Sequence, residues 1–213
     1  MKQYPSIPYF NGDAFNRHRS RLGTGHLAWY VFDKLDGSNV RAEWSRKKGF
    51  TKFGRRKALL DDSDPFLPEA EELIRDKYGH DLDNIFRGRR WQKVTAFFEF
   101  FGPNSFAGVH EAETHDVVLF DVRPFKQGML PPRELLKRFG HLELPKFLHH
   151  GTTEGLLEDV LYSRLPGMTF EGVVAKGPVV RQLGGPIMFK IKSLAWYEKL
   201  KAVRAGNKEF IAQ

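Results

Sequence analysis

A lysine at position 34 stands two residues before the start of the turn-forming segment 36–38, which reads Asp-Gly-Ser. An apolar run over 27–32 precedes it, and a second run over 40–44 alternates in character. We therefore expect two strands that an Asp-Gly turn joins as a hairpin. Lys34 would lie at the end of the first strand, beside backbone amides that can face a phosphate group. The alternative for a lone lysine in such a turn is a solvated surface charge.

A primary amine at this place could act as a nucleophile toward phosphorus. The pKa of a lysine side chain is about 10.4 in water, so roughly one amine in a thousand is unprotonated near neutral pH. Burial and nearby cations lower this pKa. Lys190 and Lys192 are two residues apart and share one face of a predicted strand. We expect these two cations, together with a bound metal ion, to lower the pKa of Lys34.

Two glutamates stand within or beside apolar stretches. Glu99 interrupts the run 94–101, and Glu171 precedes the run 172–175, which Lys176 follows. An unpaired carboxylate is costly to bury. Glu99 is therefore expected either on an exposed face or in contact with a ligand.

The segments 33–39, 98–103, 170–176 and 188–192 resemble, in this order, motifs I, III, IV and V of the covalent nucleotidyltransferases. This superfamily contains ATP-dependent DNA and RNA ligases and mRNA-capping guanylyltransferases. The matching letters are KLDG, FEFFGP, EGVVAK and KIK. The resemblance spans 29–192 and implies an α+β, ATP-grasp-like nucleotidyltransferase fold. In that fold, helices flank antiparallel sheets and the nucleotide pocket lies between the sheets.

The resemblance also implies a reaction. Lys34 would attack the α-phosphate of ATP, form a lysyl–AMP phosphoramidate and release pyrophosphate. A divalent ion, Mg²⁺ or Mn²⁺, is expected because pyrophosphate leaves well only when its charge is neutralised. Glu171 would help to hold this metal ion. Lys190 and Lys192 would grip the α-phosphate.

Further residues are assigned to the nucleotide by the same resemblance. Glu99 would accept a hydrogen bond from the ribose. Phe120, directly before Asp121, would stack on the adenine, although a phenylalanine in this apolar strand could equally belong to the core. The complete predicted set is Lys34, Glu171, Lys190 and Lys192 for catalysis, with Asp36, Gly37, Asn39, Arg55, Glu99, Phe120 and Lys176 for nucleotide binding.

Asn39 distinguishes between branches of the superfamily. The segment 37–39, Gly-Ser-Asn, resembles phage and kinetoplastid-editing RNA ligases, whereas DNA ligases usually carry arginine at its third place. The Gly-Pro pair at 102–103 also resembles those RNA ligases. Asp36 departs from them, because their residue there is often histidine and aspartate is usual in DNA ligases and capping enzymes.

We therefore predict an ATP-dependent RNA ligase that seals 5′-phosphate and 3′-hydroxyl ends. The alternatives are a minimal DNA ligase that acts on nicks and a non-catalytic module that binds nucleotides or RNA. Residues 193–213 follow the last motif, and nothing in them resembles an OB-fold or another C-terminal domain. We expect residues 1–213 to form a single nucleotidyltransferase domain.

The composition favours a polyanionic partner. The formal net charge is +8 and the isoelectric point is about 9.6, and basic residues facing phosphates release counterions when they bind. Candidates for a phosphate track lie at 17–21, 46–48, 55–57 and 87–90. We expect the partners to be RNA ends, nicked or single-stranded, with DNA ends as the alternative.

Other classes are excluded by composition. The chain has no cysteine, which excludes disulfides, thiolate catalysis and cysteine–zinc sites. It shows no apolar run of membrane-spanning length and no signal-peptide pattern. We expect a monomeric cytoplasmic protein without a membrane partner.

Periodicity and turn residues predict the elements that position these side chains. Gly79 and His80 are expected to end a helix that begins at Glu69 and to leave 81–92 irregular. Ser193 is expected to cap the last helix, which Gly206 stops. The further expected elements are strands over 50–53, 94–101, 116–122, 167–176 and 187–192, and helices over 14–21, 131–140, 152–161 and 194–205.

Overall fold

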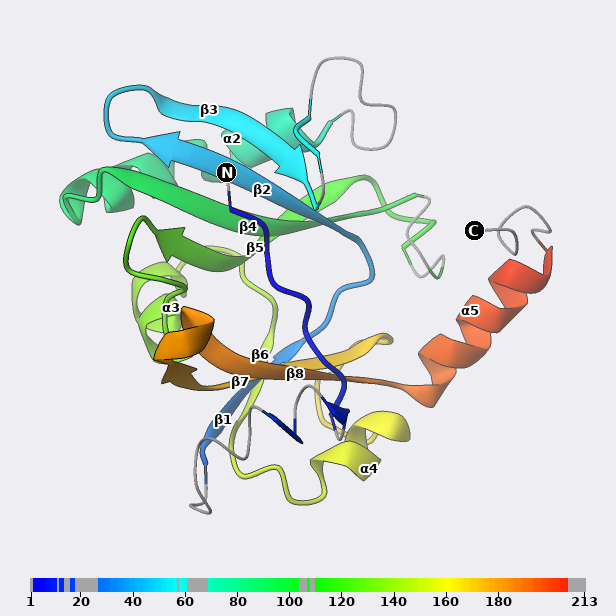
Figure 1. Ribbon diagram of the computed structural model, residues 1–213. Coiled ribbons are helices and arrows are strands. Elements are labelled where there is room, and N and C mark those ends of the chain that lie inside the picture. Colours follow the sequence, from blue (N-terminus) through cyan, green and yellow to red (C-terminus); the bar gives the residue numbers. More distant parts are fainter. Residues whose placement is uncertain are drawn as a thin grey trace.

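Two four-stranded antiparallel sheets face each other in the computed structural model, which describes residues 2–10, 12–13, 16–17, 27–56, 58–60, 69–103, 107 and 110–206 (Figure 1). The first sheet has the order β6-β1-β7-β8, and its strands are β1 (Trp29–Asp33), β6 (Phe147–Gly151), β7 (Gly172–Val180) and β8 (Gly185–Lys192). The second has the order β3-β2-β4-β5, and its strands are β2 (Ser38–Ser45), β3 (Gly49–Arg55), β4 (Lys93–Phe101) and β5 (Asp116–Pro124). The helices are α2 (Ala70–Gly88), α3 (Pro132–Phe139), α4 (Leu156–Leu161) and α5 (Leu194–Gly206), with a 3-10 turn, η2 (Arg181–Leu183).

The expected hairpin around Lys34 is wrong. β1 pairs with β6 and β7, whereas β2 pairs with β3 and β4 in the other sheet. Residues 34–37 therefore cross from one sheet to the other. An alternating pattern predicts a strand and an Asp-Gly pair predicts a turn, but neither says which strands pair. Both edges of β1 are occupied by strands more than a hundred residues away in sequence.

Helix α2 is longer than expected, and the predictions that Gly79 and His80 end it and that 81–92 is irregular are wrong. Its buried residues recur every four positions: Ala70, Ile74, Tyr78, Leu82 and Phe86. The last two continue the apolar stripe beyond the glycine, so packing against the second sheet holds the helix together. A glycine inside a helix costs only about 1 kcal/mol relative to alanine, which this burial outweighs.

The other expected elements are present with shifted ends. Strand β7 begins at Gly172 rather than 167, and α4 begins at Leu156 rather than 152. Ser193 caps α5 as predicted, since its Oγ accepts a hydrogen bond of 3.0 Å from the backbone nitrogen of Trp196. The sequence does not predict strand β6, because its residues, FLHHG, show no regular alternation of apolar and polar types. The helix expected over 14–21 and the segment 61–68 lie largely or wholly outside the described residues.

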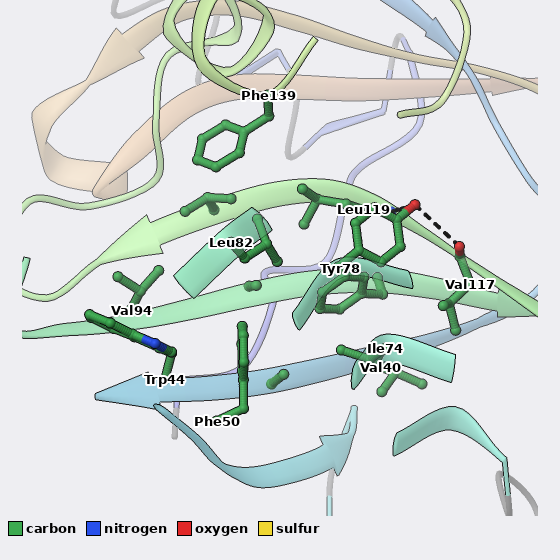
Figure 2. Packing of buried hydrophobic residues seen from close by; sticks show 14 of the residues in the cluster. Val40, Trp44, Phe50, Ile74, Tyr78, Leu82, Val94, Val117, Leu119 and Phe139 are labelled. Carbon is green, nitrogen blue, oxygen red and sulfur yellow. Dashed lines mark hydrogen bonds between the residues drawn. The ribbon is translucent and has the colours of Figure 1, made fainter. Parts of the chain in front are cut away.

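The main core lies between the second sheet, α2 and α3. Figure 2 shows Trp44, Phe50, Tyr78 and Phe139 within it, and the Tyr78 hydroxyl donates a hydrogen bond of 3.3 Å to the carbonyl oxygen of Val117. A second core joins the outer face of the first sheet to α4. Among the described residues, no helix is both long enough and apolar enough to cross a membrane.

These two cores take alternate residues from the strands. Phe189 and Ile191 of β8 point into the second core, so Lys190 and Lys192 point to the opposite face, toward the other sheet. Phe98 and Phe100 of β4 similarly enter the main core and leave Glu99 on the inner face. The alternation thus collects the polar residues of both sheets in the space between them.

Candidate active site

A cavity of about 720 Å³ opens between the two sheets. Most of the residues that we predicted to bind the nucleotide line this cavity. The predicted residues that line it are Lys34, Gly37, Asn39, Arg55, Glu99, Phe120, Lys176 and Lys190. The predicted residues that do not line it are Asp36, Glu171 and Lys192.

Lys34 lies at one wall of this cavity and shares a carboxylate with a second lysine. Its Nζ is 2.8 Å from Oε1 of Glu171, and Nζ of Lys192 is 3.2 Å from the same oxygen. Glu171 is 3% exposed. The structure therefore brings three of the four predicted catalytic residues into one ion-pair network.

The backbone holds this network in place. The nitrogen of Lys34 donates to the carbonyl oxygen of Gly172 at 3.0 Å, and the nitrogen of Ser193 donates to that of Glu171 at 2.9 Å. Gly172 has a φ of 134°, and a Cβ there would lie 2.2 Å from the carbonyl oxygen of Ile191. A glycine is therefore required directly after Glu171, which explains the Glu-Gly pair.

The pKa of Lys34 is raised, contrary to the expectation. Burial would lower this pKa, but the carboxylates of Glu171, Glu99 and Asp36 outweigh burial. Three carboxylates surround this amine, and two of them, Glu171 and Glu99, come from distant parts of the sequence. The pKa of Glu171 is also raised, because its burial outweighs the attraction of Lys34 and Lys192.

The two lysines of β8 behave as expected for buried cations. Burial lowers the pKa of both Lys190 and Lys192, and the charge of Lys34 adds to the effect. Each also lies over an aromatic ring that the sequence analysis did not single out. Nζ of Lys192 is 3.1 Å from the ring centroid of Trp196, and Nζ of Lys190 is 4.5 Å from that of Tyr9.

Asp36 and Gly37 fix the position of the segment that follows Lys34 through contacts with the surrounding protein. Asp36 is 3% exposed, and its carboxylate accepts hydrogen bonds from the backbone nitrogen of Ala107 at 2.6 Å and from Nε1 of Trp196 at 3.2 Å. A Cβ on Gly37 would lie 2.3 Å from the carbonyl oxygen of Phe100. The Asp-Gly pair thus lets the segment after Lys34 pack closely against β4.

The opposite wall is formed by β4 and β5. Glu99 of β4 stands directly opposite Asn39 of the neighbouring strand β2. Burial raises the pKa of Glu99 to about 7 against the attraction of Lys34, and Glu171 and Asp36 add to the rise. Phe120 is partly buried, and the ring of Tyr4 packs edge-on against it at 4.9 Å between centroids. The ring of Phe120 is therefore held at the cavity wall by the N-terminal segment.

A buried polar cluster lies next to Phe120. Nζ of Lys176 is 3.0 Å from Oδ2 of Asp121 and donates to the carbonyl oxygen of Phe120 at 2.8 Å. The hydroxyl of Tyr4 donates to the same Asp121 oxygen at 2.6 Å. Sequence reasoning missed Tyr4 and gave Asp121 no role. The signal for Asp121 was a carboxylate inside an apolar strand, the same signal that drew attention to Glu99.

Two of the predicted basic clusters lie side by side. Nη1 of Arg46 donates to the carbonyl oxygen of Arg87 at 3.1 Å, and Nη1 of Arg87 donates to that of Arg46 at 3.0 Å. Arg55 and Arg56 line the cavity. Of the remaining predicted track residues, His18, Arg19, Arg21 and Lys57 lie outside the described part of the chain.

The fold is similar to that of an RNA ligase from Naegleria gruberi. A structure of that ligase with pyrophosphate matches with a TM-score of 0.67 at 18% identity, over 95% of this chain and 58% of that chain. A structure of a mutant with ATP and Mn matches with a TM-score of 0.65 at 18% identity. A structure of another mutant, with AMP and Mn, matches with a TM-score of 0.64 at 16% identity. Both of these matches cover 94% of this chain and 58% of the other.

The comparisons bear on the fold. The chain spans less than two thirds of the length of these RNA ligases. At identities of 16% to 18% the likeness shows a shared architecture, and it confirms the predicted α+β fold with two antiparallel sheets. No protein-family model and no curated protein sequence matches the chain.

Proposed function

We propose that this chain is an ATP-dependent RNA ligase that works through a covalent lysyl–AMP intermediate. The observation that carries the proposal is the position of Lys34. Its amine lies at the wall of a cavity of about 720 Å³ and shares the carboxylate of Glu171 with Lys192. The Naegleria gruberi structures, which are of an RNA ligase with ATP, AMP or pyrophosphate, support the same reading.

In the first step the unprotonated Nζ of Lys34 attacks the α-phosphorus of the substrate ATP. A nitrogen–phosphorus bond forms, the bond to the bridging oxygen breaks, and pyrophosphate leaves with the electron pair. The lysine must lose a proton first. Glu171 is placed to accept it, since its oxygen is 2.8 Å from Nζ and burial raises its pKa toward that of a useful base.

The remaining residues act on the nucleotide in this proposal. Lys190 and Lys192 offset the charge that develops on the α-phosphate. Glu99 accepts a hydrogen bond from a ribose hydroxyl, and the ring of Phe120 stacks on the adenine. In the later steps AMP moves from Lys34 to a 5′-phosphate, and a 3′-hydroxyl then displaces AMP to form the phosphodiester.

A divalent ion fits the donor set. Oε2 of Glu171 is buried and has no hydrogen-bond partner among the described residues. These residues hold no cluster of three or more potential protein ligands, but Mg²⁺ is commonly bound by one or two carboxylates together with substrate phosphates. Glu171 would thus hold Mg²⁺ or Mn²⁺, and the ion would neutralise charge on the departing pyrophosphate.

The test is incubation of the purified protein, freed of attached AMP, with α-labelled ATP and Mg²⁺ or Mn²⁺. We expect an acid-labile label on the wild type and none on Lys34→Ala or Lys34→Arg. Label from GTP instead of ATP would move the assignment to capping chemistry. Tight ATP binding without any label would favour the non-catalytic alternative.

A second experiment separates RNA from DNA substrates. Labelled protein is mixed with 5′-phosphorylated RNA or DNA ends, single-stranded or nicked, and transfer of AMP to each is followed. We expect transfer to RNA. Transfer to nicked DNA alone would support the DNA ligase alternative, which Asp36 had suggested. The carboxylate of Asp36 is engaged within the protein, so its identity is explained without reference to the nucleic acid.

A further inference from the structure

A second hollow, of about 910 Å³, lies at the other end of the space between the sheets. Its walls come from the start of β4, the end of β5 and the turn between β7 and β8. Its charged lining residues are Lys2, Lys93, Arg123, Lys126, Arg181 and one carboxylate, Glu43. Five cations against one carboxylate give this hollow a strong positive charge.

Most of this charge is not offset by the protein. Lys93 forms an ion pair with Glu43 at 2.9 Å. Among the residues that the structure describes, no carboxylate forms an ion pair with Arg123, Lys126 or Arg181, nor with Lys2. Like charges gathered in a concave surface repel one another and raise the local concentration of anions. An anionic ligand would relieve this repulsion.

The walls of the hollow are fixed by backbone contacts. The nitrogen of Met129 donates to the carbonyl oxygen of Gly184 at 2.8 Å, which joins the turn after β5 to the turn before β8. Gly128 has a φ of 80°, and a Cβ there would lie 2.6 Å from that same oxygen. The turn that carries Lys126 is therefore held against the turn that carries Arg181.

The second hollow lies within a short distance of the first. On β8, Gly185 lines the second hollow and Lys190 lines the first, and five residues of strand span about 17 Å at about 3.3 Å each. The N-terminal segment connects them, since Lys2 lines the second hollow and Tyr4 the first. One extended polyanion could contact both places.

An aromatic ring at the rim narrows the class of ligand. Phe125 is 60% exposed, and Nζ of Lys126 is 5.5 Å from its ring centroid. Exposed rings interleaved with cations serve to stack bases while the cations contact the phosphates of a single strand. A free phosphate or a nucleotide-sized anion would not require an exposed ring at the rim of the hollow.

We propose that this hollow binds the sugar–phosphate backbone of a single-stranded segment of RNA, at a distance from the reacting end. The identification of the polymer as RNA rests on the proposed ligase function. Arg123, Lys126 and Arg181 contact phosphates, and Phe125 stacks on a base. The site supplies affinity for the strand and takes no part in the transfer of AMP.

The test compares the double variant Arg123→Gln/Arg181→Gln with wild type in binding a fluorescein-labelled, 5′-phosphorylated single-stranded RNA across a salt series. Loss of two phosphate contacts should reduce the slope of log K against log salt by about 1.4, at about 0.7 for each contact. The matched control is Lys199→Gln/Lys201→Gln, which removes two exposed cations from α5. The control should keep the wild-type slope.

Two further variants complete the test. If the double variant does not fold, Lys126→Gln/Arg181→Gln replaces it, since both of these side chains are exposed. Phe125→Leu should weaken binding about fivefold or more with an unchanged slope. A slope change no larger than that of the α5 control would overturn the proposal.

The labelling of Lys34 by ATP is measured on the same samples and should not change in any of these variants. Absence of label from the wild type would sink the proposed ligase function, while the comparison of binding slopes would still decide the second hollow.

Discussion

The indole nitrogen of Trp196 donates a hydrogen bond of 3.2 Å to the carboxylate of Asp36, 160 positions away in the sequence. The same indole ring lies beneath the ammonium group of Lys192. Helix α5 is thereby tied to the segment that follows Lys34 and to the strand that carries the KxK pair. Residues that do not line the cavity thus hold in place the segment that follows Lys34.

Glu171→Gln should slow the attachment of AMP to the protein by about 10²-fold or more, because it removes a base within reach of Lys34. Loss of this charge should also lower the pKa of Lys34, which carboxylates now raise. The rise of the labelling rate with pH should therefore occur at lower pH in the variant. Glu198→Gln, exposed on α5, is the control. An unchanged rate would remove Glu171 from the reaction.

Phe120→Ala should weaken ATP binding roughly 5- to 150-fold, because stacking on a base contributes about 1–3 kcal/mol. Calorimetric titration in a Lys34→Ala background would measure this without turnover. Phe125→Ala is the matched control, since that ring lies at the second hollow. Equal ATP affinities in the two variants would return Phe120 to a core role.

Gly37→Ala should destabilise the protein by about 1–3 kcal/mol, as overpacking does. The added Cβ would lie 2.3 Å from a backbone oxygen of β4, so either the segment 34–37 or β4 must shift. Gly79→Ala is the control within α2, where a Cβ meets nothing within 4 Å. That change should stabilise the protein by up to about 1 kcal/mol. Urea denaturation of both variants measures the contrast, and destabilisation of equal size would contradict it.

Lys176→Met should cost about 3–5 kcal/mol of folding free energy, because it leaves the fully buried carboxylate of Asp121 without its cation. The double variant Lys176→Met/Asp121→Asn should recover part of this loss. The measurement is a double-mutant cycle: the free energy of unfolding is determined by denaturation for the wild type, both single variants and the double variant. Strict additivity of the two losses would show that the pair is not coupled.

The stability of the ligand-free protein should depend on the ionisation of Glu99. Its pKa is about 7 in the folded protein and near its ordinary value when unfolded. Between these values the folded state binds the extra proton, so stability falls as pH rises from about 4.5 to about 7. Relative to Glu99→Gln, the wild type should lose about 3 kcal/mol over this range. A difference that stays constant from pH 5 to pH 8 would contradict the shift.

Local pattern was enough to predict several parts of the fold. Helix α3, with prolines at its start and Gly140 at its end, lies where those residues indicated. The KxK spacing placed Lys190 and Lys192 on one face of β8, because side chains alternate along any strand. The apolar run 94–101 likewise predicted the strand β4 that carries Glu99.

Other parts were outside the reach of local pattern. The length of α2 depended on whether Leu82 and Phe86 would find a sheet to pack against, and helix propensity at Gly79 could not show this. The pKa of Lys34 depended on carboxylates from β4, from the residue before β7 and from its own segment. Tyr4 gained its partner, Asp121, from a strand more than a hundred residues away.

The sequence by itself therefore indicated which residues are candidates for the proposed chemistry, through the four motifs, and that Lys190 and Lys192 share one face of a strand, through their spacing. The tertiary structure decided that β1 and β2 belong to different sheets, that Asp36 meets Trp196, and that a second basic hollow stands beside the first. Contacts of this kind join distant residues, and their free energy depends on burial and charge that exist only once the sheets have assembled.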